Sequence, residues 1–479
     1  MNMEANSTQN TNNHAIVCPF HRQGHINPST KLSLNLALKG VTITFLNFEH
    51  VQQEITKASG CQSNNNPFKA VNFGQTPVGD IRYQVVSDGL PVDFDRTGRL
   101  MEYLDWYMSG GMYDQLEKAI GKIVLESTPK VNVLIIDTFY PWASKLARKF
   151  GLRCASFWTQ PAIVFNLYYH VHLLRHYRHF DCLDKRIDPI DYIPGLKSID
   201  PKDLMSFLQD KDPSTKMHKH IFHAFHDVRS VDYVLCNSVQ ELEHDTISTL
   251  QTLIPFYPIG PILLSGPTKT RVPTSLWAES NCSEWLKPKS HGSVLYVSFG
   301  SLANFSKNDV MEIAYGLMDS HVDFIWVLRP RTVLDEPNDI LPIGFEDEVR
   351  GRGIIVPWTD QVTVLSHQAT GGFLTHCGWN SVLESIWHEV SMLCFPVFAD
   401  QITNRKLVVD DWKIGVNLCE GRTIQRAEIS AKIKYFMSQK PREVLKENIR
   451  ETRNLLQSAL KADGSSEKYV NKFIEELAK

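Results

Sequence analysis

The sequence predicts an α/β protein made of two Rossmann-like, doubly wound parallel-sheet domains that face each other across a central cleft. Three observations predict this fold class. The chain has 479 residues, which is too many for one ordinary domain. Short apolar segments alternate with helical patterns, as they do in parallel sheets flanked by helices. This alternation starts twice, once in each half of the chain.

The first half opens with a predicted strand at residues 14–19, HAIVCP. A glycine turn, Gln23-Gly24-His25, follows and leads into an apolar helical pattern that continues to Leu38. Further buried strands are predicted at 41–46, 133–137 and 233–237. The strand-turn-helix order at the start is typical of a ligand-binding edge in a doubly wound sheet.

The second half repeats this order, with predicted strands at 294–300, 324–328, 354–357 and 372–375. At the end of the chain, Ser465 is suited to cap a helix whose apolar stripe packs on another element. The predicted limits are a flexible N-terminal tail at 1–13, an N-terminal Rossmann-like domain at 14–258, a Pro/Gly/Ser/Thr-rich linker at 259–288, a C-terminal Rossmann-like domain at 289–460, and a C-terminal helix at 461–479 that packs back on the N-terminal domain.

Composition excludes several classes of partner. Lys and Arg number 50 against 53 Asp and Glu, so charge gives no reason to expect nucleic acid or an anionic membrane. No window reaches the ~18 apolar residues of a membrane span, and the polar start does not resemble a signal peptide. Nine scattered cysteines without a CxxC pair favour reduced thiols and a cytoplasmic protein. The sequence carries no signal of oligomeric state.

Residues 371–384, GGFLTHCGWNSVLE, join a predicted strand to a predicted helix. The free N–H groups and the dipole at such a helix N-terminus favour an anion. Gly378 permits close backbone approach, Asn380 and Ser381 can cap the helix or contact a phosphate, and His376 adds a donor that can become cationic. By itself the segment fits an ordinary capped helix equally well.

Common nucleotide and hydrolase signatures do not occur. The sequence has no GxxxxGK[ST] and no GxSxG, and its nearest approach to GxGxxG, Gly351-Arg-Gly353, precedes a strand. P-loop ATPases, typical dinucleotide enzymes and α/β-hydrolases are therefore not supported.

A longer segment is more specific. Residues 358–401 read WTDQVTVLSHQATGGFLTHCGWNSVLESIWHEVSMLCFPVFADQ, and they closely resemble the signature segment of plant UDP-sugar-dependent glycosyltransferases, the family 1 enzymes with the GT-B fold. The resemblance extends along most of the chain, through PFHRQGHIN (19–27), FWT (157–159), LCNS (235–238), YPIGP (257–261) and VLYVSFGS (294–301).

The resemblance implies that the C-terminal domain binds the UDP-sugar donor and that the N-terminal domain binds the acceptor. In this family the place of Trp358 stacks on uracil, that of Gln361 hydrogen-bonds the base or ribose, and that of Glu384 accepts the ribose hydroxyls. The diphosphate is held at the places of Ser301, His376, Asn380 and Ser381. The sugar is contacted at those of Trp379, Asp400, Gln401 and, in some members, Thr159. Gln401 resembles the glucose-preferring members. Taken singly, each of these residues also fits a core, surface or loop role.

The resemblance also implies the catalytic pair. His25 matches the general base, and Asp137 matches the carboxylate that orients its ring and stabilises the imidazolium. Asp137 also fits the ordinary role of capping the helix after its strand. The implied reaction is a single displacement in which glucose passes from UDP-glucose to a hydroxyl of a small lipophilic aglycone, a plant secondary metabolite of phenolic or terpenoid type, with inversion to a β-glucoside. No metal and no cofactor beyond the donor are expected.

Alternatives and departures remain open. A GT-B epimerase or phosphorylase is the alternative among enzymes, and a catalytically silent UDP-sugar-binding protein is the alternative from another class; retention of His25 and Asp137 argues against the silent protein. Glu389-Val390-Ser391 replaces the family's Gly-Val-Pro, and His21 replaces a frequent proline. His21 could line the acceptor pocket. Four histidines at metal-compatible helical spacings (His170, His172, His176 and His179) also fit a helix beside the acceptor cleft.

Overall fold

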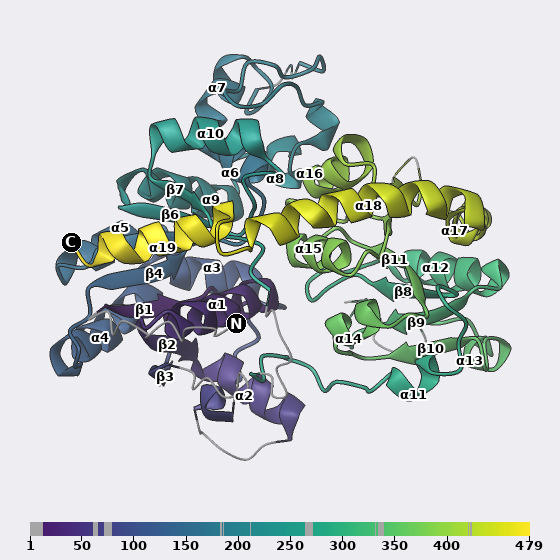
Figure 1. Ribbon diagram of the computed structural model, residues 1–479, viewed down its shortest axis with the longest axis horizontal. Helices are drawn as coiled ribbons and strands as arrows, with labels where there is room; N and C mark the ends of the chain where they lie inside the picture. The colour runs from purple at the N-terminus through teal and green to yellow at the C-terminus, as the bar shows by residue number, and fades with distance from the viewer. Residues whose placement is uncertain are drawn as a thin grey trace, which may run out of the picture.

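Two parallel sheets form the framework of the chain, one in each half (Figure 1). Every pairing between their strands is parallel. The fold class predicted from the sequence is therefore confirmed. The structure is a computed structural model, and it describes residues 13–60, 66–70, 79–182, 184, 186–210, 212–263, 272–330, 332–333, 340–419, 421 and 424–479.

The first sheet has seven strands and is buried at its centre. Both faces of β1 and β4 are covered, which explains why these strands are apolar at nearly every position rather than at alternate positions. The strands occur in the order β3 (Ile81–Val86), β2 (Thr42–Phe48), β1 (His14–Cys18), β4 (Val133–Asp137), β5 (Arg153–Trp158), β6 (Tyr233–Cys236) and β7 (Phe256–Pro258).

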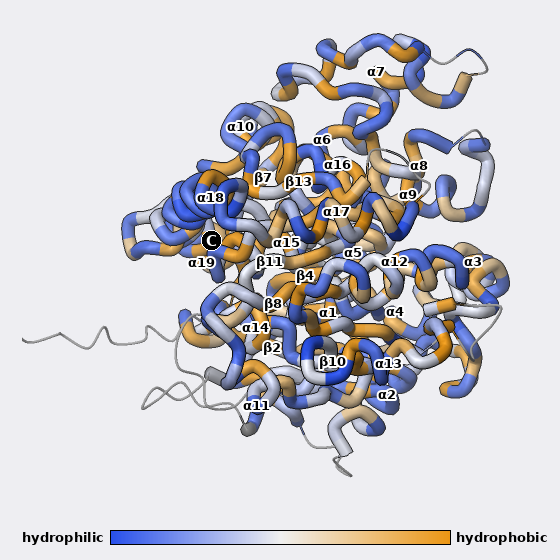
Figure 2. The backbone as a smooth tube through the Cα atoms, turned by 90° about the vertical axis from the view of Figure 1, so that its right-hand side faces the viewer, coloured by the Kyte–Doolittle hydropathy of each residue, from blue (hydrophilic) through white to orange (hydrophobic). Residues whose placement is uncertain are grey.

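The second sheet has six strands and the same doubly wound topology, in which the first strand in sequence, β8, lies at the centre and later strands extend the sheet on both sides. Figure 2 shows the strands as largely hydrophobic segments at the centre of the molecule. Their order is β10 (Gly353–Val356), β9 (Asp323–Val327), β8 (Val294–Ser298), β11 (Thr370–Thr375), β12 (Met392–Cys394) and β13 (Gly415–Asn417).

Helices cover the faces of both sheets. The helices of the first half are α1 (Gln23–Leu38), α2 (Glu49–Ser59), α3 (Leu100–Met108), α4 (Gly111–Glu126), α5 (Ala143–Lys149), α6 (Ala162–Tyr169), α7 (Val171–His176), α8 (Ser206–Gln209), α9 (Lys216–Asp227) and α10 (His244–Leu253). Those of the second half are α11 (Ser283–Leu286), α12 (Lys307–Ser320), α13 (Phe345–Glu348), α14 (Gln361–Ser366), α15 (Trp379–Trp387), α16 (Gln401–Lys406), α17 (Arg426–Met437), α18 (Gln439–Ala459) and α19 (Ser465–Leu477).

The last two helices connect the halves. Figure 1 shows α18 beside the second sheet and α19 beside the first. Phe473 and Ile474 of α19 belong to the same buried cluster as Ala15 and Val133 of the first sheet. The sequence suggested that Ser465 caps α19, and this is wrong. The N-cap is Gly464, no side chain caps the helix, and the Ser465 hydroxyl donates to Glu241 at 2.8 Å.

The ends of the predicted segments differ in how far the structure describes them. Residues 1–12 and the linker residues 264–271 lie outside the described residues. Asn13, which the sequence placed in the flexible tail, is buried and donates to the Ile474 carbonyl at 3.1 Å. The other domain limits stay predictions. Among the described helices, none has the combination of length and apolar character that a transmembrane segment needs.

Candidate active site

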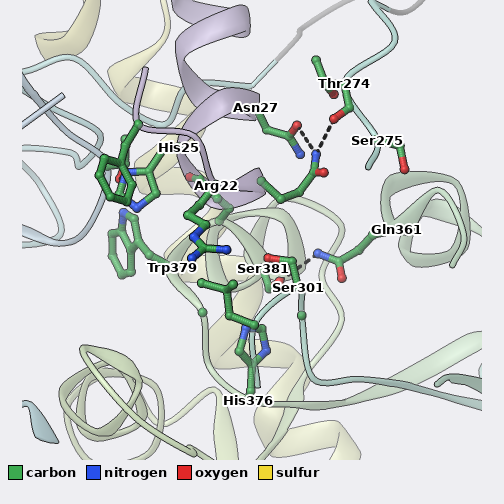
Figure 3. Close-up of a pocket in the computed structure, with 18 of the residues that line it drawn as sticks. Arg22, His25, Asn27, Thr274, Ser275, Ser301, Gln361, His376, Trp379 and Ser381 are labelled. Atoms are coloured by element: carbon green, nitrogen blue, oxygen red, sulfur yellow. Dashed lines mark hydrogen bonds between the residues drawn. The ribbon is translucent and has the colours of Figure 1, made fainter. Parts of the chain in front are cut away.

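A cavity of about 1520 Å³ opens between the two halves, next to the carboxyl ends of the strands in both sheets. Figure 3 shows side chains from α1, the 272–277 segment, α14 and the β11–α15 turn converging on it. Of the predicted site residues, only Asp137 does not line its wall. Those that do are His25, Thr159, Ser301, Trp358, Gln361, His376, Trp379, Asn380, Ser381, Glu384, Asp400 and Gln401.

His25 and Asp137 form a hydrogen-bonded pair at the first sheet. The His25 Nδ1 atom lies 2.7 Å from Oδ2 of Asp137, and the Asp137 side chain is 2% exposed. Asp137 also accepts the Phe139 backbone N–H at 3.0 Å, so the strand-end turn holds its carboxylate in place. With the proton on Nδ1, the Nε2 atom of His25 is left as a base.

Thr159 belongs to this pair rather than to the opposite wall. Its Oγ1 lies 3.2 Å from His25 Nδ1, at the end of β5, next to β4 in the sheet. The sequence linked Thr159 to the sugar, and its contact with His25 was not anticipated. The hydroxyl is a second group that orients the imidazole, while the carboxylate of Asp137, which only accepts, fixes its tautomer.

Aromatic side chains surround the base. The rings of Phe20 and Phe139 each lie 5.6 Å from the His25 ring in edge-on orientation. Tyr107 and His220 continue this surface, with ring centroids 4.8 Å apart. Burial lowers the pKa of His220 to about 4, so the ring is neutral. This part of the cavity can accommodate a flat, lipophilic molecule next to the base.

His21 is separate from the catalytic pair. It is 4% exposed, its Nδ1 lies 3.2 Å from the Tyr103 hydroxyl, and its Nε2 has no partner within the described residues. Burial holds its pKa well below the usual value. A neutral, enclosed imidazole on the acceptor side agrees with the preference for His25 as the base.

The histidines between residues 170 and 179 do not converge on one site, since His170 and His179 contact different partners. His170 bonds the Asn166 side chain at 2.9 Å, whereas His179 bonds Tyr192 at 2.8 Å and the Asp188 carbonyl at 3.0 Å. Across the described residues, no group of three or more His, Cys, Asp or Glu side chains is arranged to hold a metal ion.

His376 fills the space between two glycine turns. A Cβ on Gly300 would lie 2.3 Å from the His376 Nε2 atom, and one on Gly378 would lie 2.5 Å from it. Gly300 also has a φ of +69°, a left-handed conformation that glycine adopts without strain. The turn after β8, which carries Ser301, and the turn after β11 therefore both close tightly on this ring.

The charge near this turn comes from Arg329 and not from His376. Burial and the nearby Arg329 lower the pKa of His376 to about 4, so near neutral pH the imidazole is uncharged and is able to donate one hydrogen bond to a ligand. Arg329 is 8% exposed; its Nε donates to the Gly300 carbonyl at 2.7 Å and its Nη2 donates to Ala303. Burial lowers its pKa only to about 10, so the guanidinium stays cationic.

The N-terminus of α15 is joined to the first half. Gly378 is the N-cap, and no side chain caps the helix, so the capping role considered for Asn380 and Ser381 is wrong. Asn380 Nδ2 donates instead to the Gly24 carbonyl at 2.7 Å, next to His25. Trp379 is 3% exposed and its indole N–H donates to the Asn237 carbonyl at 2.7 Å.

The residues predicted to bind the uracil and the ribose of the donor lie together in another part of the cavity. Trp358 faces Trp277, with ring centroids 4.7 Å apart and planes inclined by 32°. Gln361 Nε2 donates to Glu384 at 2.8 Å and to the Ser381 hydroxyl at 2.9 Å. Lys31 of α1 reaches across from the first half and contacts Glu384 at 3.1 Å.

Asp400 and Gln401 lie at the start of α16. The Gln401 Oε1 atom accepts the backbone N–H groups of Val397 and Phe398 at 2.9 and 3.1 Å, which fixes the loop before the helix. Asp400 accepts from Asn404 Nδ2 at 2.6 Å, and burial raises its pKa to about 6. The arrangement presents one carboxylate and one amide to the cavity.

Sequence reasoning missed Arg329, Trp277 and Lys31. Trp277 is one of two tryptophans in the otherwise Pro/Gly/Ser/Thr-rich linker, and a large aromatic residue in such a segment is a signal of a binding site that could have been used. Arg329, directly after an apolar strand, is a comparable signal. Lys31 on a helix gives no such indication, because a solvated lysine is the ordinary reading.

Comparisons with known proteins agree with this geometry. The sequence model of a family described as UDP-glucoronosyl and UDP-glucosyl transferase matches residues 269–457. UDP-glycosyltransferase 86A2 of Arabidopsis thaliana is 48% identical over 469 residues, covering 97% of this chain and 94% of the relative. UDP-glycosyltransferase 86A1 of the same plant is 46% identical over 468 residues, with the same coverage.

Solved structures share the fold over nearly the whole chain. The crystal structure of Os79 from O. sativa with UDP has a TM-score of 0.81 at 25% identity and covers 97% of this chain and 100% of its own. A UDP-glucosyltransferase from Polygonum tinctorium capable of glucosylating indoxyl, in complex with 3,4-dichloroaniline, has a TM-score of 0.79 at 28% identity and covers 98% and 99%.

Proposed function

Because the chain belongs to the plant family 1 UDP-glycosyltransferases, we propose that it moves glucose from UDP-glucose to a hydroxyl of a small lipophilic aglycone, a plant secondary metabolite of phenolic or terpenoid type. The observation that carries this proposal is the His25–Asp137 pair, 2.7 Å apart, at the wall of a cavity that the family's donor residues also line. The product is a β-glucoside.

In the proposed reaction, Nε2 of His25 takes the proton of the acceptor hydroxyl while the oxygen attacks the anomeric carbon. Asp137 holds the other ring nitrogen and stabilises the imidazolium that forms. The bond between the anomeric carbon and the diphosphate breaks on the opposite face, and UDP leaves with the electron pair. One displacement inverts the α-linked donor.

The leaving diphosphate develops negative charge that the second half can stabilise. The N–H groups at the start of α15, the His376 imidazole and Ser301 supply hydrogen bonds, and Arg329 supplies positive charge behind the glycine turn. Removal of one such donor typically costs about 2.7–4 kcal/mol of transition-state stabilisation.

The preference for glucose is proposed from Asp400 and Gln401. A carboxylate and an amide at adjacent positions can bind two neighbouring sugar hydroxyls, and the backbone bonds of Gln401 orient its amide so that Nε2 remains available. Support for a cytoplasmic location comes from the thiols: among the described residues no two cysteines are joined by a disulfide, and most cysteines are buried.

The proposal is tested by measuring UDP release from UDP-glucose with a pooled panel of phenolic and terpenoid alcohols, followed by mass spectrometry. A product heavier by one hexose is expected. His25→Ala should lower kcat/KM about 10²- to 10⁴-fold, while His244→Ala, a matched change at a histidine with a 71% exposed side chain, should not.

Two results would contradict the proposal. If UDP-glucose does not bind, measured by calorimetry, the assignment of the donor site is wrong. If UDP-glucose binds and His25→Ala transfers glucose as fast as the wild type, the catalytic role of the pair is wrong.

A further inference from the structure

Arg22 lies in the turn between β1 and α1, and its side chain enters the cavity near His25 (Figure 3). Its Nη1 donates to the Thr97 hydroxyl at 3.1 Å. Within the described residues the guanidinium makes no other hydrogen bond or ion pair. A guanidinium has a planar fork of N–H donors, so most of the binding capacity of Arg22 is available to a ligand.

The surroundings of Arg22 do not neutralise it. Glu54 and Tyr103 favour the charged form, but no carboxylate of the described residues lies within the 4.0 Å of an ion pair, and Glu54 is exposed. Arg96 is also near, but Asp88 binds it through two bonds of 2.7 and 2.8 Å. Burial keeps the neighbouring His21 neutral.

The other lysine or arginine of the described cavity wall, Lys31, is paired. It contacts Glu384 at 3.1 Å. Among the described residues of the cavity wall, the lysines and arginines are Lys31 and Arg22, and of these two Arg22 lacks a carboxylate partner. Burying a charge that has no ion-pair partner costs desolvation free energy, and an anionic ligand that pairs with the charge offsets this cost.

The one described hydrogen bond of the Arg22 guanidinium is to Thr97, in the loop before α3 of the first half. The charged and ionisable groups that act on the pKa of Arg22, namely Tyr103, Glu54 and Arg96, also belong to the first half. The residues expected to hold the diphosphate, in contrast, follow β8 and β11 of the second sheet. This placement favours an anion carried by the acceptor over the diphosphate of the donor.

We propose that Arg22 binds a carboxylate of the acceptor, and that the acceptor is a hydroxy acid with a hydrophobic body whose hydroxyl group lies at His25. This inference rests on the proposed function and names the acceptor class. Phe20, two residues before Arg22 in the chain, also lines the cavity, and its ring centroid lies 5.6 Å from that of His25 and 6.4 Å from that of Tyr107. The Phe20 and Tyr107 rings form the apolar surface for the body.

The carboxylate is a recognition group and takes no part in bond making. The hydroxyl oxygen bonds to the anomeric carbon, its proton passes to His25, and UDP leaves as the anomeric carbon–oxygen bond breaks. The product is a glucoside with a free carboxylate, which survives mild alkali, whereas an ester of glucose does not.

The test uses 4-hydroxyphenyl alkanoic acids of increasing chain length, each beside its methyl ester, with UDP-glucose as donor. Wild-type enzyme should have a higher kcat/KM for at least one acid than for its ester. Arg22→Gln should reduce that acid-to-ester ratio roughly 10- to 100-fold, mainly through KM, because a hydrogen-bonded charge pair is lost. Arg22→Lys should restore part of the ratio. Arg450→Gln, at an α18 arginine with a 57% exposed side chain, is the matched control.

Several results would overturn the inference. The first is an acid-to-ester ratio that Arg22→Gln leaves unchanged, or a wild type that prefers every ester. The second is a loss of UDP affinity in Arg22→Gln, by calorimetry with UDP alone, as large as the loss in KM for the acid, which would assign Arg22 to the donor. The third is an alkali-labile product. Transfer to neutral alcohols but to no hydroxy acid would refute the acceptor class and leave the proposed function intact.

Discussion

Asp400 is a half-buried carboxyl group at the cavity wall, and its protonation should control donor binding. Burial raises its pKa to about 6, so the group is ionised at pH 7.5 and protonated at pH 5. The ionised form accepts two hydroxyl hydrogen bonds, whereas the protonated form loses acceptor capacity. Affinity for UDP-glucose should therefore be full above pH 6 and weaken as the pH falls through about 6.

Calorimetry with UDP-glucose between pH 5 and pH 7.5 checks this expectation. Asp400→Asn should bind more weakly at pH 7.5, by roughly 10-fold for the loss of a charged hydrogen bond, and should lack the step near pH 6. A step of the same size in Asp400→Asn would assign the titration to another group.

The residues of the site were predictable to the extent that they lie in one segment. The resemblance of residues 358–401 to the family's signature segment grouped the expected donor residues, and in the structure these residues line one cavity. Lys31, Trp277 and Arg329 could not be found this way, because they reach the site from separate elements and only tertiary packing makes them neighbours. The environment of His376 was also beyond the sequence, since its neutrality depends on burial.

At the scale of elements, the two glycine turns determine where His376 can lie. An alanine at Gly300 would place a Cβ 2.3 Å from the imidazole and would hold a left-handed φ of +69°. The backbone cost alone is about 1–2 kcal/mol. Since the His376 ring must move to admit the methyl group, Gly300→Ala should weaken UDP binding and lower Tm.

Gly344→Ala is the matched control for this change. Gly344 also has a positive φ, +77°, but a Cβ there meets nothing within 4 Å. Both variants should therefore lose stability through the backbone, whereas only Gly300→Ala should lose UDP affinity by calorimetry. Equal UDP affinity in the two variants would show that the turn does not position His376 for the ligand.

The strands found from the sequence were those with continuous apolar runs, such as β4 and β8 at the centres of the sheets. Those not predicted as strands were β3, β5, β7, β12 and β13. Three of them are only three residues long, and β3 mixes polar and apolar residues at the edge of its sheet. A short or edge strand is defined by its pairing partner more than by its own pattern.

At the scale of the whole molecule, the cleft is spanned by contacts that couple the two halves. Asn380 bonds Gly24, Trp379 bonds Asn237, and Lys31 bonds Glu384, each between the first half and the second. The base, which lies on α1, is thereby fixed relative to the turn expected to hold the diphosphate. The C-terminal helix α19 adds a connection remote from the cleft, because it follows the second half in sequence but packs on the first sheet.

This topology predicts that a core substitution in α19 destabilises the distant half of the chain. Phe473 is 1% exposed and packs edge-on against Tyr233 of β6, with ring centroids 5.4 Å apart. Phe473→Ala should cost about 3–5 kcal/mol of the free energy of unfolding and should speed hydrogen exchange in β1, β4 and β6.

Phe436→Ala, in α17, removes an equally buried ring from the second sheet's core and should speed exchange in β8, β9 and β11 instead. Exchange followed by mass spectrometry separates the two patterns. If Phe473→Ala loosened the second sheet as much as the first, α19 would belong energetically to the half that precedes it in sequence, and its packing on the first sheet would contribute little to stability.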